Sequence, residues 1–586
     1  MEDTNKNTLR IRFFGAIGIT SGSCTLLEYF SCNEKKKLYF LVDAGSFEDE
    51  DCEQAKVRSI FLNEIAKKIK IIFITHSHKD HIGYLPELIK HGFRGKIYCT
   101  QATHNLIILN LSSKDSKKDN NNYLRSISFI DIEKLFKQGF GKNQIRIAKD
   151  FMCGFLRSGH ILGACSFYFE WTENNYGTHI QPKNKEWKRI HFSGDIGPNS
   201  KKTLSNIIYK CYQTPQFDDR TNYIIMESTF GDKYIDKENI IKDRINKLSN
   251  VINNAIKTNR SIVIVASTLD ILQHILIDLL LIFFNIENKR NIISLERTDY
   301  ENINKIYYEA NYKYKDLINY NEIFIKNISD YFLSKNVNDL IKDEGNRIKF
   351  KYLSDDFLNN FNLTDTDFNT LEKRINELLS ISLLKKVNKP KIYIFTTKMF
   401  NSGKYADFLK KYLLNINTIV LIAGLHLKNT NGYYLKNLYN YKNYEMRDIS
   451  IDLKSENIRL KDIKSQIEDM TDYYFDHADQ EQLIEYITPK EDYKKTFTVL
   501  LNHGTNASYE ALKNKIEEKI CNVHIEMPKF NEWLNLSTFE YEEEDIIIDN
   551  NKDYKIIKVN DIYIKYPINY RTEKLEKIKK FIENMK

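Results

Sequence analysis

Short apolar runs separated by polar turns make up the first 200 residues of the chain. Six runs that are rich in β-branched and aromatic residues predict strands: Ile11–Phe14, Leu38–Val42, Ile71–Thr75, Lys96–Cys99, Ser166–Trp171 and Arg189–Phe192. Apolar residues at helical spacing predict helices at Cys52–Lys68 and Leu85–His91. The candidate functional residues follow the ends of predicted strands, which is typical of a layered α/β domain.

A second pattern begins near residue 222. Predicted strands and helices alternate there, in the order Tyr223–Met226, Ile240–Ile256, Ser261–Ala266, a helix through Phe284, Lys391–Thr396, Lys404–Leu413 and Thr418–Ala423. This alternation predicts a small parallel-sheet domain with crossover helices. Residues 290–390 are rich in Tyr, Asn and Lys, and we interpret them as an enlarged, mostly helical insertion without catalytic motifs.

Composition adds few constraints. A chain of 586 residues with 42% hydrophobic and 28% charged residues predicts a soluble protein of two or three domains. The net charge of +8 is weak evidence for a polyanionic partner and fits an ordinary solvated surface equally well.

Eight cysteines without a CxxC pair, and no secretory signal, indicate free thiols in a reducing cytoplasm. The most apolar stretch, Ile275–Phe284, is interrupted by Asp278 and is too short to cross a membrane, so we expect a buried helix and no membrane partner.

The segment Ile71–His81, IIFITHSHKDH, carries the clearest chemical signal. A buried strand is expected to deliver His76, His78, Asp80 and His81 to one tight loop. The two histidines two residues apart can bind one ion, while Asp80 and His81 point the other way and can bind a second. Imidazole and carboxylate ligands together suit Zn²⁺.

This motif and three later ones resemble the metallo-β-lactamase fold, which is an αββα sandwich. The later motifs are Asp43 in LVDAG, His160 in SGHILGACSFYFE and Asp195 in HFSGDIG. The resemblance implies that Asp43 supports the metal loop, that His160 completes the first metal site and that Asp195 bridges both ions. A bridging carboxylate would offset the repulsion between two neighbouring cations. The implied cofactor is two Zn²⁺ per chain, with Mn²⁺ as the alternative, and a metal-activated hydroxide would attack an ester or phosphodiester.

Five segments of the second half resemble successive motifs of the β-CASP nucleases, a branch of this fold. These segments are IIMESTFG (224–231), TTKMFNSG (396–403), TIVLIAGLHLKNTNG (418–432), FDHADQEQLIEYI (475–487) and LLNHGTNASYEAL (500–512). The resemblance implies that His503 binds the second metal. It also implies that Glu227 holds His477 protonated and aimed at the scissile phosphate. The expected catalytic residues are therefore Asp80, Glu227 and His477.

The family has RNA-acting and DNA-acting members, and the third motif separates them. RNA-acting members resemble this chain in having histidine where DNA-acting members have valine, so His503 favours RNA. The chain is thus expected to be a metal-dependent RNA phosphodiesterase, similar to the mRNA 3′-end cleavage endonuclease and ribonuclease J. A DNA nuclease and an inactive nuclease-like scaffold are the alternatives. Two departures from the motifs are Asp476, where a small residue is usual, and Thr505 in place of a glutamate.

The resemblance also implies a domain division. Residues 1–208 would form the first part of the metallo-β-lactamase domain, 209–470 the inserted β-CASP domain, and 471–586 the closing part with a C-terminal tail.

Thr100 and Thr103 are expected to be structural, and His104 to lie on a helix surface. The expected partner is RNA, with DNA less favoured, and a homodimer or a processing complex is left open. The expected location is cytoplasmic, or nuclear if the chain is eukaryotic.

Overall fold

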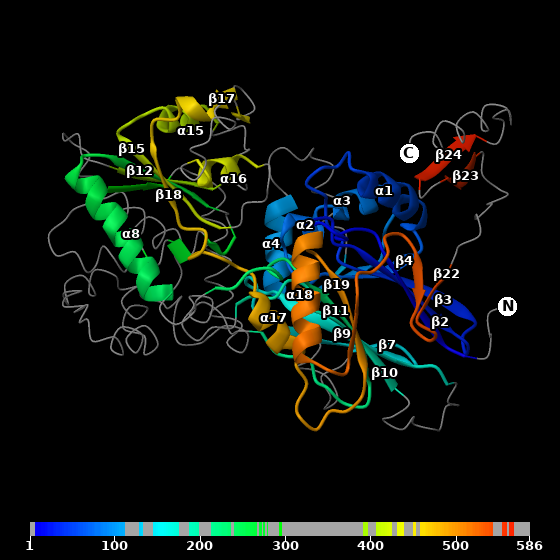
Figure 1. Cartoon of the computed structure of the whole chain (residues 1–586). Helices are drawn as coiled ribbons and strands as arrows, with labels where there is room; N and C mark the ends of the chain where they lie inside the picture. Colours follow the sequence, from blue (N-terminus) through cyan, green and yellow to red (C-terminus); the bar gives the residue numbers. More distant parts are fainter. Residues whose placement is uncertain are drawn as a thin grey trace, which may run out of the picture.

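The structure is a computed structural model. The chain forms a larger body, which contains an eight-stranded and a seven-stranded sheet, and a smaller body, which contains a five-stranded sheet (Figure 1). It describes residues 6–111, 128–132, 145–174, 187–198, 212–235, 240–266, 269–271, 274–275, 278, 292–295, 391–396, 406–424, 430–438, 449–452, 457–542, 554–559 and 562–567. The expected insertion at 290–390 lies outside these residues except for the short strand β13 (Ile292–Leu295).

One sheet of the larger body has eight strands, in the spatial order β22-β21-β1-β2-β3-β4-β5-β6. The strands are β1 (Thr8–Phe13), β2 (Thr25–Ser31), β3 (Lys36–Val42), β4 (Ile69–Phe73), β5 (Lys96–Cys99), β6 (Ser128–Asp131), β21 (Trp533–Asn535) and β22 (Glu540–Glu542). Strands β3 to β6 run parallel, and β1, β2, β21 and β22 extend the sheet in antiparallel fashion. The sheet therefore joins the start of the chain to residues beyond 530.

The second sheet has seven strands, in the order β20-β19-β11-β10-β9-β8-β7. They are β7 (Ile145–Ala148), β8 (Phe151–Arg157), β9 (Cys165–Thr172), β10 (Trp187–Phe192), β11 (Thr221–Glu227), β19 (Phe497–Asn502) and β20 (Val523–Glu526). Strand β11 pairs in parallel with both β10 and β19. Because β19 returns from far along the chain, the sandwich closes only after the inserted segment.

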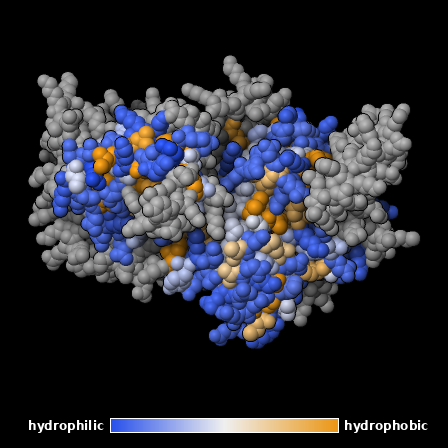
Figure 2. All heavy atoms as spheres, turned by 45° about the horizontal axis from the view of Figure 1, so that its top comes forward, coloured by the Kyte–Doolittle hydropathy of each residue, from blue (hydrophilic) through white to orange (hydrophobic). Residues whose placement is uncertain are grey.

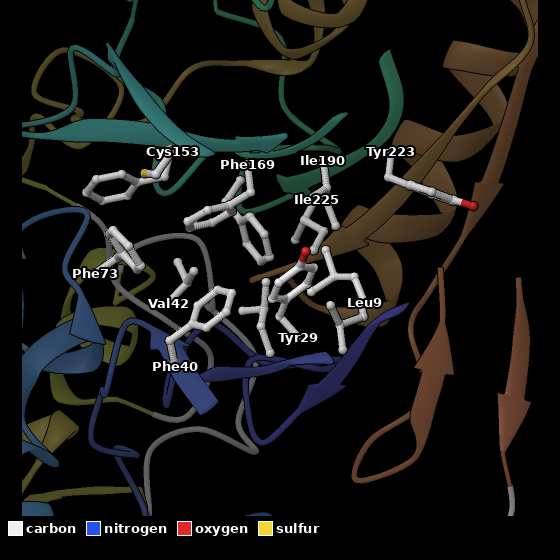
Figure 3. Packing of buried hydrophobic residues seen from close by; sticks show 14 of the residues in the cluster. Leu9, Tyr29, Phe40, Val42, Phe73, Cys153, Phe169, Ile190, Tyr223 and Ile225 are labelled. Carbon is white, nitrogen blue, oxygen red and sulfur yellow. The ribbon is translucent and has the colours of Figure 1, made fainter. Parts of the chain in front are cut away.

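The main core lies between these two sheets (Figure 3). Phe40 and Phe73 of one sheet meet Phe169 of the other, with ring centroids 5.5 and 5.0 Å from it. Each such fully buried side chain contributes roughly 1.5–3 kcal/mol relative to exposure. Apolar clusters on the outer sheet faces pack against helices, which gives the four layers of the expected αββα sandwich. The helices are α1 (Glu53–Ile65), α3 (Leu85–Lys90) and α4 (Gln101–Leu111) on one face and α17 (Gln480–Ile487) and α18 (Asn506–Lys519) on the other.

The smaller body contains a five-stranded sheet in the order β13-β14-β12-β15-β18, and every pairing in it is parallel. The further strands are β14 (Lys391–Thr396), β12 (Ser261–Ala266), β15 (Thr418–Ile422) and β18 (Gln466–Asp469). One face packs against α8 (Ile240–Lys257). The other packs against α15 (Ala406–Leu413), α16 (Asn431–Lys436) and the hairpin β16 (Ser450–Asp452) and β17 (Asn457–Arg459). Burial on both faces explains why SIVIVA and TIVLI are continuous apolar runs.

The expectation for Tyr223–Met226 was wrong in one respect. We assigned this strand to the parallel-sheet domain, but β11 lies in the seven-stranded sheet of the sandwich. A fully buried parallel strand has the same apolar pattern in either sheet, so pattern alone cannot assign it. We propose that the inserted domain begins after β11, between Glu227 and α8, rather than at 209. The proposed return near 471 is unchanged, because β18 belongs to the small sheet and α17 to the sandwich.

The described residues outside the sheets include part of the helix expected after residue 266. The described part of the expected helix after residue 266 is helical and buried at Ile271, His274, Ile275 and Asp278. No helix among the described residues is long and apolar enough to cross a membrane. On the face seen in Figure 2, hydrophilic residues predominate. The seven cysteines in the described part are free thiols, five of them buried, as expected. Beyond the sandwich, β23 (Tyr554–Val559) and β24 (Ile562–Pro567) form a separate hairpin.

Candidate metal centre

The seven side chains predicted as metal ligands converge at one end of the sandwich. All lie in segments that follow strands: His76 and His78 in the loop after β4, Asp80 and His81 in the short helix α2 (Lys79–Ile82) after that loop, His160 after β8, Asp195 after β10 and His503 after β19. All are buried except His78, which is half-buried. Four strands from two sheets thus deliver ligand-type groups to one place.

The first group consists of His76, His78, His160 and Asp195, whose ligand atoms all lie within 4.8 Å of one another. Nδ1 of His78 is 3.2 Å from Nε2 of His76 and 3.0 Å from Nε2 of His160. Oδ2 of Asp195 is 3.6 Å from each of the same two Nε2 atoms. Three imidazoles and one carboxylate oxygen therefore face a common centre.

The second group consists of Asp80, His81, Asp195 and His503. Nε2 of His503 lies 3.3 Å from Nε2 of His81 and 3.5 Å from Oδ2 of Asp80. The other oxygen of Asp195, Oδ1, lies 3.3 Å from Nε2 of His81. Asp195 is the residue common to both groups, and it directs one carboxylate oxygen into each.

These groups fit two metal ions. Nitrogen ligands bound at about 2.0–2.1 Å to a tetrahedral zinc lie about 3.3 Å apart, which is close to the spacing of the atoms within each group. Without an ion, two imidazole nitrogens that face each other at this distance could share at most one proton, in a single hydrogen bond. Asp195 Oδ1 is also buried without a hydrogen-bond partner of normal geometry, a costly arrangement unless a cation binds it.

The ionisable side chains of the site shift one another's pKa values. Burial raises the pKa of Asp195, but electrostatic interactions with His503, His81 and His76 outweigh burial and bring it well below its ordinary value. Burial lowers the pKa of His76 well below its ordinary value, and the neighbouring His81 lowers it further. A neutral imidazole and an ionised carboxylate are the protonation states that bind a metal.

Hydrogen bonds outside the two groups orient the ligands. Asp43, at φ +60°, accepts hydrogen bonds from the Thr75 backbone and hydroxyl, and its Oδ2 lies 2.8 Å from Nδ1 of His81. His160 Nδ1 is 2.8 Å from the carbonyl oxygen of Asp476. Such partners fix which ring nitrogen faces the metal. Through these contacts Asp43 joins the Thr75 backbone to the ring of His81.

We expect Asp43→Asn to lower metal affinity at the second group by about 10- to 100-fold, because an amide cannot hold His81 as a carboxylate does. A competitive chelator titration would measure this. Asp150→Asn is the matched control, since Asp150 is also buried in the sandwich but bonds to Asn33 instead. Equal affinities for both variants and the unaltered protein would show that Asp43 has no role in metal binding.

Glu227 and His477 form a pair beside the first group. Nδ1 of His477 lies 2.8 and 3.1 Å from the two carboxylate oxygens of Glu227, whose Oε1 also accepts from the backbone N–H of Ile196. Nε2 of His477 lies 4.0 Å from Oδ2 of Asp195. Burial lowers the pKa of His477, but the charge of Glu227 and the hydrogen bond to it outweigh burial and raise it to about 10. This shift favours the protonated form of His477, in which Nδ1 bonds to Glu227 and Nε2 is left on the side of Asp195.

Sequence reasoning missed two contributors. Thr229 contacts Nδ1 of His503 through its hydroxyl at 3.1 Å and donates to the His503 carbonyl at 2.9 Å. The Asp476 carbonyl holds His160, a backbone role for which no side-chain pattern gives a signal. Thr100 and Thr103 are structural as expected, because both hydroxyls donate to the Gly163 carbonyl in the His160 loop.

Comparisons with known proteins agree with this geometry. Residues 17–107 match the family model of the metallo-beta-lactamase superfamily. The chain is 26% identical over 230 residues to ribonuclease TTHA0252 of Thermus thermophilus, covering 38% of this chain and 44% of that protein. It is 21% identical over 540 residues to transcription termination factor FttA of Methanosarcina mazei, covering 89% and 70%. Among solved structures, a long form of RNase Z from yeast is 15% identical with a TM-score of 0.24, covering 45% of this chain and 38% of that one.

The class of protein follows from the match at residues 17–107, which is to the metallo-β-lactamase superfamily, and the four-layer sandwich and the two ligand groups are consistent with it. Within that class its homologues include a ribonuclease and a transcription termination factor. The chain spans less than half the length of the matched ribonuclease and 70% of the matched termination factor. A domain of this superfamily implies bound metal ions, and the two ligand groups have the residues to hold them.

Proposed function

We propose that the protein is a metal-dependent RNA phosphodiesterase with two Zn²⁺ ions per chain. One observation carries the proposal: two ligand groups that share Asp195 lie beside His477, whose Nδ1 contacts the carboxylate of Glu227. The ribonuclease named above supports RNA as the substrate class, as does histidine at position 503. We also propose that the small sheet is the inserted β-CASP domain and that substrate binds between the two bodies.

Each part of the site has a proposed role. Bound zinc would supply a hydroxide at neutral pH and neutralise phosphate charge. Asp80, His81 and His503 would hold one ion, His76, His78 and His160 the other, and Asp195 would bridge them. His477 would donate a hydrogen bond or a proton from Nε2 to the phosphate or to the leaving oxygen. Glu227 would keep His477 charged and fix its ring.

The first test is metal content. We expect elemental analysis to find about two zinc ions per chain, because seven ligand residues suffice for two four- to five-coordinate sites when one of them bridges. Dialysis against a chelator should remove both the metal and the activity, and zinc or manganese should restore them. A folded protein that takes up no metal would favour the inactive scaffold.

The second test concerns substrate. Labelled RNA and DNA of the same sequence, incubated side by side with the zinc-loaded protein, should give faster cleavage of RNA. Faster cleavage of DNA would make the protein a DNA nuclease of the same fold. The products of a 5′-labelled RNA would show whether cleavage is internal or begins at an end.

A further inference from the structure

Asp278 interrupts the most apolar stretch of the sequence, and the structure shows what its carboxylate contacts. Its Oδ2 accepts a hydrogen bond from Nε of Arg244 at 2.6 Å and another from the Tyr474 hydroxyl at 2.7 Å. Nη2 of Arg244 reaches Oδ1 at 3.2 Å. All three side chains are buried. A buried ion pair of this kind is often no more stable than apolar residues of the same size, so stability alone does not explain it.

The position of Tyr474 in the chain suggests a role. It lies three residues before His477, in the segment that passes from the small body to the sandwich (Figure 1). On the side of the small body, Met470 donates its backbone N–H to Ile422 at 2.8 Å, and Tyr474 packs into the core cluster against α8. On the side of the sandwich, Ala478 donates its backbone N–H to Ile196 at 2.7 Å. Residues 475–477, which we call the crossing segment, therefore lie between two anchors in different bodies.

The crossing segment carries two contacts of the candidate site. The Asp476 carbonyl fixes the ring of His160, and the His477 side chain pairs with Glu227. Both contacts lie within three residues of Tyr474. A shift of the anchor in the small body would therefore move these groups relative to Asp195 and the ligands, which are held by the sandwich.

We propose that the buried network of Arg244, Asp278 and Tyr474 is a positioning device for His477. The inserted domain would then do more than cover substrate, because its core sets where the catalytic histidine lies. This inference rests on the function proposed above for His477. The Tyr474 hydroxyl suits the role because burial and the charge of Asp278 raise its pKa well above the ordinary value, so it remains a neutral donor.

Tyr474→Phe tests the proposal, since it keeps the packed ring and removes one hydrogen bond. The matched control is Tyr223→Phe, because Tyr223 is a buried tyrosine of the sandwich whose hydroxyl donates to the Leu536 carbonyl at 2.8 Å. We expect Tyr474→Phe to lower kcat on RNA by about 10-fold, with KM and zinc content unchanged, because small misplacements of a catalytic group cost up to about 100-fold. Tyr223→Phe should leave kcat unchanged. Equal effects of the two substitutions on kcat would overturn the proposal.

A double-mutant cycle separates positioning from general loosening of the fold. If Tyr474 acts through His477, Tyr474→Phe should cause no further loss of kcat when added to His477→Ala. A full 10-fold loss in both backgrounds would show that Tyr474 affects catalysis by another route and would contradict the proposal.

Hydrogen exchange gives a readout that does not depend on RNA cleavage. In the full-length zinc-loaded protein, Tyr474→Phe should raise amide exchange across residues 470–480 about 10-fold, whereas Tyr223→Phe should not. Unchanged exchange in this segment would refute the positioning role even if the protein cleaves RNA. If Tyr474→Phe raises amide exchange but the unaltered zinc-loaded protein cleaves no RNA, the positional role of Tyr474 is supported and the proposed function is refuted.

Discussion

His477→Ala should lose about 10² to 10⁴ of the rate of RNA cleavage while retaining its zinc. The physical reason is that His477 lies beside the first ligand group without belonging to the proposed ligands. Its Nδ1 is already engaged by Glu227, which leaves only Nε2 to serve the substrate. Steady-state kinetics on a short RNA, together with elemental analysis of the same preparation, would measure both quantities.

The leaving group provides an internal check on this role. A phosphodiester with a good leaving group, such as bis(p-nitrophenyl) phosphate, needs little proton donation, so the defect of His477→Ala should shrink on it. His104→Ala is the matched control, because His104 lies on α4 and stacks on Phe129, away from the ligands. Loss of one zinc from His477→Ala would make His477 a ligand. Full activity on RNA would remove it from the mechanism.

Asp195→Ala should lose metal as well as activity, with RNA cleavage falling by about three orders of magnitude or more. Asp195 is the one residue that both ligand groups share, and without its charge two bound cations would repel each other across a short distance. A bound metal provides several kcal/mol of transition-state stabilisation, and each 1.36 kcal/mol corresponds to about tenfold in rate. Elemental analysis and RNA cleavage at saturating zinc would test this.

Asp476→Asn is the control for Asp195→Ala. The Asp476 carboxylate lies near both His477 and His160, but the ring of His160 is hydrogen-bonded to the backbone carbonyl of Asp476, which asparagine retains. This variant should therefore keep its zinc. If Asp195→Ala retained two zinc ions while Asp476→Asn lost one, Asp195 would not be the residue that bridges the ions.

Local pattern was sufficient to predict much of the fold. The six strands predicted in the first 200 residues correspond to β1, β3, β4, β5, β9 and β10, because apolar β-branched runs bounded by polar turns have few other stable conformations. Strand β2, TLLEYFS, was missed although it is almost wholly buried. Its interior Glu28 is neutralised by Arg10, a partner on the neighbouring strand that local pattern cannot reveal.

The ligand groups were predictable for a different reason. A metal needs particular side chains, and these sit in short motifs whose residue types are visible in the sequence. The backbone contact between Asp476 and His160 and the buried pair of Arg244 and Asp278 leave no such signal, because they join residues far apart in the chain. Strand β11 was assigned to the wrong sheet for the same reason, since its partner β19 follows the whole inserted domain.

The central claim is that the joined ligand groups and His477 make this protein an RNA-cleaving metalloenzyme. The most direct measurement is cleavage of a 5′-labelled RNA by the zinc-loaded protein, before and after the metal is removed with a chelator. We expect cleavage that disappears with the metal, returns with added zinc and is greatly reduced in His477→Ala. A folded protein that carries two zinc ions per chain and leaves the RNA intact would contradict it.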